Sequence, residues 1–117
     1  MDDLDTLDFY DIDDSNTDVI TQETYNNIVD IMKNYDLIKV NYKSTNKMTK
    51  TEKTKILGIR AHQLALGALT EVNIPKYIVD HLERAEYELK LRKTPFIIRR
   101  LVADNYEYWK IEDLIIV

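Results

Sequence analysis

The segment at residues 48–65 constrains the fold of this chain more than any other part of the sequence. It opens with the pattern Thr49-x-x-Glu52, in which the threonine hydroxyl can accept a hydrogen bond from the Glu52 amide while the Glu52 carboxylate reaches back to the Thr49 amide. This reciprocal cap predicts a helix over about residues 50–69, because apolar residues then recur at the helical period.

Apolar residues lie in two sets along this predicted helix. A helix that is apolar over so much of its circumference is normally covered on more than one side. In a domain this small, we expect part of that cover to come from another chain. Close approach of a neighbouring backbone is one explanation for Gly58, since glycine costs about 1 kcal/mol in a helix interior relative to alanine. The first set follows one face of the helix and consists of Leu57, Ala61, Leu64, Ala65 and Ala68. The second set lies away from that face and consists of Ile56, Ile59 and Leu66.

A second helix, a hairpin and one short helical turn are predicted after residue 74. Pro75 suits the first turn of a helix, because its missing amide would be unpaired there. Thr94-Pro95 ends the helix, and strands at 96–101 and 106–110 flank a turn at 104–105. The apolar stripe expected on this helix is Ile78, Leu82, Ala85 and Leu89. The ion pairs expected on its solvent side are Asp80 with Arg84, Glu86 with Lys90 and Glu88 with Arg92. The short helical turn is expected at 111–114.

The amino-terminal third of the chain is strongly acidic. Residues 1–36 hold 11 acidic residues and one lysine, whereas residues 37–117 hold 15 Lys or Arg against 10 Asp or Glu. Residues 1–18 have too few apolar side chains to offset the entropy of ordering them, so we predict disorder there. A short helix is expected at 22–36, followed by an extended stretch at 37–42 and a linker at 43–47, and the apolar face of that helix would be Ile28, Ile31, Met32 and Tyr35.

These patterns predict an α+β domain at 48–117, in which two main helices pack with a carboxy-terminal β-hairpin. An acidic, largely disordered extension at 1–47 precedes it. An isolated hairpin is barely stable in water, and the aliphatic segment at 114–117 adds surface that two helices are too small to cover. Both features indicate docking against a larger neighbour.

Residues that metal and catalytic sites need are scarce in this sequence. Cysteine is absent, His62 and His81 stand outside any two-histidine ligand spacing, and no glycine-rich phosphate loop occurs. No apolar run approaches the length needed to cross a bilayer. We therefore expect no catalysis, no metal or other cofactor, no small-molecule substrate and no membrane contact.

Several separate pieces of the sequence resemble the omega family of small subunits of DNA-directed RNA polymerases, the shared subunit six of eukaryotic and archaeal enzymes. The pieces are the capped helix at 48–65, Glu88-Leu89 in the second helix, the basic segment with proline and paired arginines at 92–100, and the aromatic strand, acidic turn and aliphatic end at 106–117. Their order and spacing match over residues 48–117. The turn between the strands lacks the family's usual glycine and proline.

This resemblance implies a structural subunit that binds the largest polymerase subunit and promotes assembly and stability of the complex. Contact with DNA would run only through that complex, because the nucleotide chemistry of the family belongs to its two largest subunits. A cellular version would act in the nucleus, and a viral one in the virion or a cytoplasmic viral factory. The implied partner-binding residues are Thr49, Glu52, Leu57, Arg60, Ala61, Gln63, Leu64, Pro95, Arg99, Arg100 and Trp109.

Ordinary interpretations stand beside these implied roles. Arg60 and Gln63 can lie on a solvated helix face or make buried polar contacts to a partner. Trp109 suits core or interface packing, with its indole N–H hydrogen-bonded. Adjacent strand residues point to opposite faces, so we expect at least one of Arg99 and Arg100 to pair with a carboxylate.

The charged segments allow two further interpretations. The acidic extension is either a solubilising segment or a docking segment, and Ser15 with Asp18 three residues on resembles an acidophilic kinase site. The lysines at 39, 43, 47, 50, 53 and 55 are either a solvated surface or a stripe that binds nucleic acid. An independent nucleic-acid-binding transcription regulator is therefore the rival function.

Overall fold

The computed structural model describes residues 16–22, 25 and 28–116 of the chain. The predicted disorder of residues 1–15, the kinase site at Ser15 and part of the expected cap at 21–24 lie outside the described residues. The elements, in chain order, are β1 (Thr17–Ile20), α2 (Val29–Met32), α3 (Tyr35–Ile38), η3 (Lys39–Asn41), α4 (Lys50–Ala65), α5 (His81–Lys90), β2 (Ile97–Val102), β3 (Asn105–Lys110) and η4 (Ile111–Asp113).

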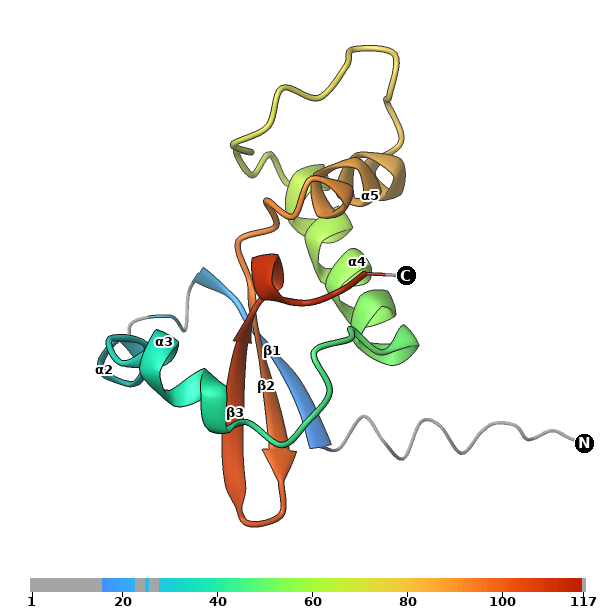
Figure 1. Ribbon diagram of the computed structural model, residues 1–117. Helices are drawn as coiled ribbons and strands as arrows, with labels where there is room; N and C mark the ends of the chain where they lie inside the picture. The colour runs from blue at the N-terminus through green and yellow to red at the C-terminus, as the bar shows by residue number, and fades with distance from the viewer. Residues whose placement is uncertain (1–15, 23–24, 26–27, 117) are drawn as a thin grey trace, which may run out of the picture.

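The architecture is α+β, as predicted. Figure 1 shows α4 and α5 lying against each other at one end of the molecule, with the loop between them at its extremity. The antiparallel sheet runs from the middle to the opposite end, and α2 and α3 lie on the side of the sheet away from α4.

The long helix begins at the predicted cap but ends sooner than predicted. The Thr49 hydroxyl accepts from the Glu52 amide at 3.1 Å, and the Glu52 carboxylate accepts from the Thr49 amide at 3.0 Å. The helix stops at Ala65, and Gly67 has φ +96°, a left-handed conformation that glycine adopts without strain. Gly58 has no atom within 4 Å of where a Cβ would lie, so no backbone within the described residues approaches it closely.

The buried side of α4 differs from the predicted stripe, and this is a correction. It consists of Glu52, Ile56, Arg60 and Leu64, spaced four residues apart. Two of these four are charged, so the apolar pattern followed a face that is only partly buried. Leu57 and Ala61 are half-buried and Ala65 is exposed.

The second helix starts six residues later than Pro75. Asp80 caps α5 by accepting from the Glu83 amide at 3.1 Å, and the helix then runs from His81. Ala85 and Leu89 are buried as predicted, whereas Leu82 is 47% exposed.

The predicted solvent-side ion pairs of α5 were wrong. Glu88, expected at the surface with Arg92, is fully buried and pairs with Arg60 instead. The pairs expected for Asp80 with Arg84 and for Glu86 with Lys90 do not form within the described part of the chain.

The predicted hairpin is present, and β1 extends it to a three-stranded sheet in the order β1-β2-β3. β1 pairs antiparallel with β2, with Thr17 opposite Arg100 and Ile20 opposite Ile97. Residues 17–20 therefore contribute a strand that the acidic composition concealed. The left-handed position of the hairpin turn is Ala103, with φ 55°, rather than the expected Asp104-Asn105.

Apolar side chains pack on both faces of this sheet. On one face, Ile98 and Trp109 join Ile56 of α4, Leu89 of α5 and Leu114 in the larger core. On the other face is a smaller core, made of Ile28, Met32, Tyr35, Ile97 and Tyr108.

The segment before α4 is helical at 35–41, and residues 42–49 then connect it to α4 without regular helix. Residues 35–38 and 39–41 form α3 and η3, so the extended stretch predicted at 37–42 was wrong. Helix at 29–38 is broken into two short pieces, and Ile31 of its expected apolar face is 42% exposed. Lys47 forms a parallel bridge with Ile115, and the segment 43–47 contributes several groups to the polar contacts described next.

Candidate partner-binding surface

A buried ion pair joins the two main helices. Arg60 Nε lies 2.6 Å from Glu88 Oε1, and Arg60 Nη2 lies 2.8 Å from Glu88 Oε2, so the contact is bidentate. The same guanidinium donates to Gln63 Oε1 and to the Leu69 carbonyl, both at 2.9 Å, and the Thr70 hydroxyl donates to Glu88. Arg60 thus fixes the packing of α4 on α5 and the start of the loop between them.

A second buried ion pair joins α4 to the sheet. Arg100 donates from Nε and Nη2 to the two carboxylate oxygens of Glu52 at 2.7 and 2.8 Å. Its remaining donors reach Ser44 Oγ and the carbonyls of Thr45 and Lys47. Every donor nitrogen of Arg100 is therefore satisfied inside the chain.

The pKa of Glu52 reflects these contacts. Burial alone would raise the pKa of this carboxyl, but hydrogen bonds from Arg100, Thr49 and Thr17 outweigh burial and hold the pKa below its ordinary value. Glu52 is thus an ionised cap that ties α4, β1 and β2 together.

The segment 43–45 is held by a third carboxylate. Glu107 on β3 accepts from the amides of Lys43 and Ser44 at 2.8 and 3.1 Å. Burial raises the pKa of Glu107, but these bonds and the Ser44 hydroxyl lower it below its ordinary value. Ser44 Oγ also accepts from the Trp109 indole at 3.1 Å, which satisfies this buried ring as predicted.

Two tyrosine hydroxyls cover the outer edge of β3. Tyr108 N donates to Tyr42 Oη at 3.1 Å, and Lys110 N donates to Tyr35 Oη at 3.2 Å. Tyr35 Oη in turn donates to Asp113 at 2.6 Å. Burial, with the bond to Asp113, raises the pKa of the Tyr35 hydroxyl, so it stays protonated over the ordinary pH range.

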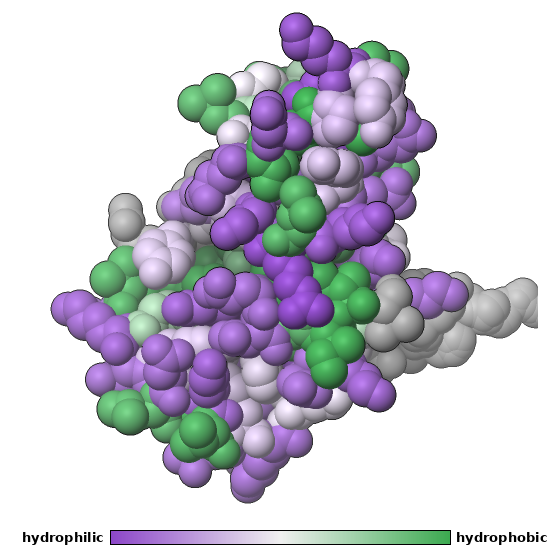
Figure 2. Space-filling model, turned by 45° about the horizontal axis from the view of Figure 1, so that its top comes forward, coloured by the Kyte–Doolittle hydropathy of each residue, from purple (hydrophilic) through white to green (hydrophobic). Residues whose placement is uncertain are grey.

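Five exposed apolar side chains lie at the α4–α5 end of the molecule. They come from the end of α4, the connecting loop and the first turn of α5. Figure 2 shows apolar groups among polar ones at this end. The exposed fractions are 76% for Leu66, 92% for Leu69, 83% for Tyr77, 75% for Val79 and 47% for Leu82, and these five residues are called the loop patch below.

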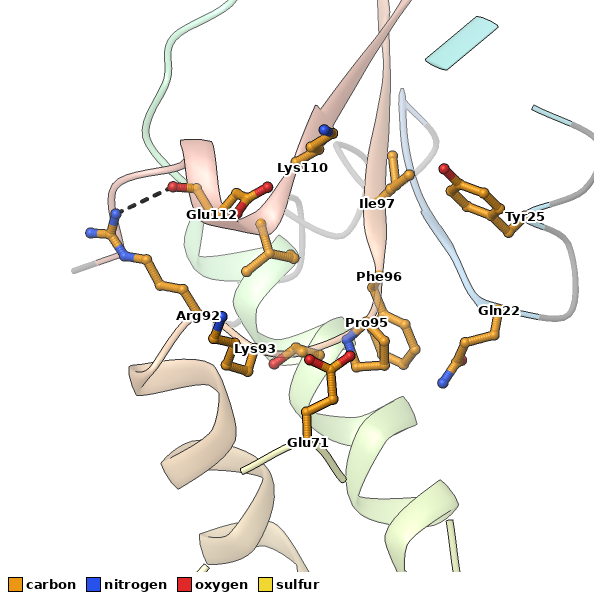
Figure 3. Close-up of a pocket in the computed structure, with 12 residues that line it drawn as sticks. Gln22, Tyr25, Glu71, Arg92, Lys93, Pro95, Phe96, Ile97, Lys110 and Glu112 are labelled. Atoms are coloured by element: carbon orange, nitrogen blue, oxygen red, sulfur yellow. Dashed lines mark hydrogen bonds between the residues drawn. The ribbon is translucent and has the colours of Figure 1, made fainter. Parts of the chain in front are cut away.

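A pocket of about 510 Å³ lies where the chain passes from α5 into β2. Figure 3 shows Arg92 turned toward η4, where its guanidinium meets the Glu112 carbonyl at 3.5 Å, while Glu71 reaches from the loop toward Pro95. Phe96, Ile97 and Ile111 are among the apolar residues that line it.

The described residues contain neither a metal-binding cluster nor a membrane-spanning helix. Among them, no group of three or more His, Cys, Asp or Glu side chains is arranged to hold a metal ion. None of their helices combines the length and apolar character needed to span a bilayer.

Curated proteins similar to this chain are named as subunits of DNA-directed RNA polymerases. No protein-family model matches it. The chain is 47% identical over 68 residues to a Caenorhabditis briggsae protein named "Probable DNA-directed RNA polymerases I, II, and III subunit RPABC2", which covers 57% of this chain and 49% of that relative. It is 43% identical over 75 residues to the Arabidopsis thaliana "DNA-directed RNA polymerases II and V subunit 6B", covering 63% and 51%. The chain is a homologue of polymerase subunit six.

A third relative comes from yeast. The Saccharomyces cerevisiae "DNA-directed RNA polymerases I, II, and III subunit RPABC2" is 39% identical over 74 residues, covering 62% of this chain and 47% of the relative. The chain therefore spans about half the length of the subunit-six relatives it matches. The resemblance predicted from the sequence is confirmed.

The residues that the subunit-six resemblance assigns to partner binding divide into two groups. Glu52, Arg60, Leu64, Arg100 and Trp109 are buried within the chain itself. Arg100 pairs with Glu52 and Arg99 pairs with Asp18, so both arginines have carboxylate partners. The residues that keep accessible surface are Thr49, Leu57, Ala61, Gln63, Pro95 and Arg99.

Sequence reasoning missed two features of this surface. The loop patch lies at 66–82, where the sequence was assigned partly to helix and partly to a plain loop. Its signal was present, since Leu69, Tyr77 and Val79 are large apolar residues that lie outside the predicted apolar faces. The pocket beside Arg92 had no such signal, because it is formed by residues distant in sequence.

Proposed function

We propose that this chain is a non-catalytic structural subunit of a multi-subunit DNA-directed RNA polymerase. It binds the largest subunit, promotes assembly and stability of the complex, and meets DNA only through the other subunits. Binding of the assembled partner to the folded state alone would stabilise that state by mass action. The chain would act in the nucleus of a cell or, for a viral enzyme, in the virion or a cytoplasmic viral factory.

The observation that carries this proposal is the loop patch, together with the names of the subunit-six relatives. Five large apolar side chains are exposed within residues 66–82, and exposed apolar groups that gather on a soluble protein commonly mark interaction sites. The buried charges behind the patch, Arg60 and Glu88, hold the end of α4 and the loop start in a fixed geometry. A preorganised surface loses less entropy on binding than a mobile one.

The deciding experiment is affinity purification of a tagged copy from cells that contain the cognate polymerase. We expect the two largest polymerase subunits to be recovered with the chain. The variant Leu69→Asp, at a 92% exposed position, should retain the fold and lose most of that recovery, because it places a charge in an apolar contact.

A matched control comes from the opposite side of the molecule. Leu37 on α3 is 75% exposed and lies outside the loop patch, so Leu37→Asp should leave polymerase recovery unchanged. Leu64→Asp is unsuitable as an interface test, because Leu64 is buried inside the chain and the substitution would unfold it. Equal recovery with Leu69→Asp and with the unaltered chain would exclude the loop patch from the interface.

The rival function depends on the lysines from 39 to 55. Lys39 pairs with Asp36 and Asp113, and Lys55 Nζ donates to the Thr17 carbonyl at 2.8 Å, so these two lysines are engaged within the chain. Binding of the isolated chain to DNA with a steep salt dependence would favour the rival, since such binding releases counterions.

A further inference from the structure

The pocket between α5, β2 and η4 combines a charged rim with an apolar floor. Its basic side chains are Arg92, Lys93 and Lys110, and its acidic side chains are Glu71 and Glu112. Pro95, Phe96, Ile97 and Ile111 supply the apolar lining. A mixed lining of this kind suits a ligand that carries both a charge and an apolar group.

Arg92 occupies this rim in a strained backbone conformation. Its φ of 59° is left-handed, and it stands at the position after α5 where glycine is usual. The Arg92 amide donates to the Leu89 carbonyl and the Lys93 amide donates to the Glu88 carbonyl, which is the Schellman pattern of helix ends. A large charged residue at such a position is characteristic of a functional site.

The basic groups of the rim lack carboxylate partners. Among the described residues, no Asp or Glu forms an ion pair with Arg92, Lys93 or Lys110. Arg92 reaches only the Glu112 carbonyl, at 3.5 Å, and Lys110 lies over the Tyr35 ring. Arg92 therefore has free donors for a ligand carboxylate, which it can bind in bidentate fashion.

A buried hydroxyl beside the rim is also unsatisfied. Thr94 follows Lys93 and lines the pocket, and its side chain is 5% exposed. Its Oγ1 has no hydrogen-bond partner among the described residues. Buried polar groups are nearly always paired, so an unpaired hydroxyl at the wall of a pocket indicates a partner outside the described residues.

We propose that this pocket binds a protein segment that presents an acidic side chain beside an apolar one. The guanidinium of Arg92 and the ammonium of Lys93 bind the carboxylate, and the apolar neighbour packs on Pro95 and Ile111. Glu71 and Glu112 disfavour a polyanion such as nucleic acid, because a second phosphate would meet their negative charge.

The peptide site does not depend on which polymerase subunit the chain contacts, and the chain alone suffices to test it. The probe is the synthetic peptide acetyl-Gly-Gly-Phe-Glu-Leu-Gly-amide, titrated into the isotopically labelled full chain and followed by amide chemical shifts. We expect saturable shifts centred on residues 92–97 and 110–112. The same peptide with Gln in place of Glu should bind about tenfold more weakly, because it loses a charge-assisted bond.

A glycine substitution separates binding from folding. Arg92→Gly removes the guanidinium but suits the left-handed backbone, so the chain should stay folded while peptide affinity falls about tenfold. Lys76→Ala, at an exposed loop position outside the pocket, should bind like the unaltered chain. Unchanged affinity in Arg92→Gly, no saturable peptide shifts, or shifts at 92–97 produced more readily by a single-stranded DNA oligomer would each overturn the proposal.

Discussion

Individual charged residues decide how the two main helices fit together. The Arg60–Glu88 pair is buried at both ends, and removal of one partner leaves the other charge unpaired in the core. We expect Arg60→Ala to lower the free energy of unfolding by about 3–5 kcal/mol, the range for a broken buried pair. Urea unfolding followed by circular dichroism measures the loss.

The exposed pair of Lys33 and Asp30 is the control for that measurement. Both side chains are largely solvent-accessible, so Lys33→Ala should change the unfolding midpoint very little. A small effect of Arg60→Ala, comparable with that of Lys33→Ala, would mean that the buried pair does not hold α4 on α5.

A second prediction at this scale concerns acid. The pKa of Glu52 is lowered in the folded chain, so ionised Glu52 stabilises the fold above the unfolded value near 4.5. That stability is lost as the pH falls below 4.5 toward the folded pKa. Glu52→Gln should therefore be less stable at pH 7 and show a flatter decline between pH 5 and pH 3, as measured by urea midpoints at each pH.

The residue scale also marks where sequence interpretation reached its limit. The capping pair Thr49–Glu52 was predictable because both partners lie within one helical turn. The burial of Arg60 and Glu88 was not, because each looks like a solvated helix residue until the partner 28 positions away is known. A periodic sequence pattern predicts contacts within one helix or strand, whereas an ion pair between residues distant in sequence produces no such pattern.

At the scale of elements, the end of α5 stores avoidable strain. A left-handed conformation costs a non-glycine residue about 1–2 kcal/mol. Glycine avoids this steric cost but loses more backbone entropy on folding, which cancels part of the gain in stability. We therefore expect Arg92→Gly to raise the free energy of unfolding by about 0.5–1 kcal/mol. Thermal unfolding detects the increase, and a lower melting temperature would show that the Arg92 side chain itself stabilises the helix end.

The edge of β3 should respond to alkali. The pKa of the Tyr35 hydroxyl is raised on folding, so its contribution is complete below the ordinary value of 10.0 and is lost as the pH rises through the higher folded value. Tyr35→Phe should be less stable at pH 7, and the difference from the unaltered chain should shrink above pH 10. Unfolding midpoints from pH 8 to pH 11.5 test this.

Element types were more predictable than element boundaries and partners. The capped helix, the hairpin and the final helical turn follow from periodicity and turn residues. β1 did not, because Thr17–Ile20 stands beside an acidic stretch and becomes a strand only by pairing with β2. Within the described part of the helix expected at 22–36, α2 ends at Met32 and α3 begins at Tyr35, whose hydroxyl accepts from the Lys110 amide of β3.

At the scale of the whole molecule, one sheet separates two cores of unequal size. The smaller core covers Ile97 and Tyr108 with residues from 28–35. A chain that begins at Lys43 lacks β1 and Tyr42 as well as residues 28–35 of this smaller core, but should keep the packing of α4 and α5 on the β2–β3 hairpin and expose that face. We expect lower stability and concentration-dependent association by ultracentrifugation, whereas a monomer as stable as the full chain would show that the smaller core is dispensable.

The hydroxyls of Tyr35 and Tyr42 have a consequence for the isolated chain. This chain exposes the loop patch, and exposed apolar surface together with an open strand edge favours the growth of fibrils. In this chain the loop patch and the edge of β3 lie at different ends of the molecule. The outward amides of Tyr108 and Lys110 already donate to the hydroxyls of Tyr42 and Tyr35, so another β-strand must displace these two tyrosines before it can pair with β3 there. The β3 edge of the isolated chain is therefore protected against strand addition at these two positions, while the loop patch at the other end of the molecule stays exposed.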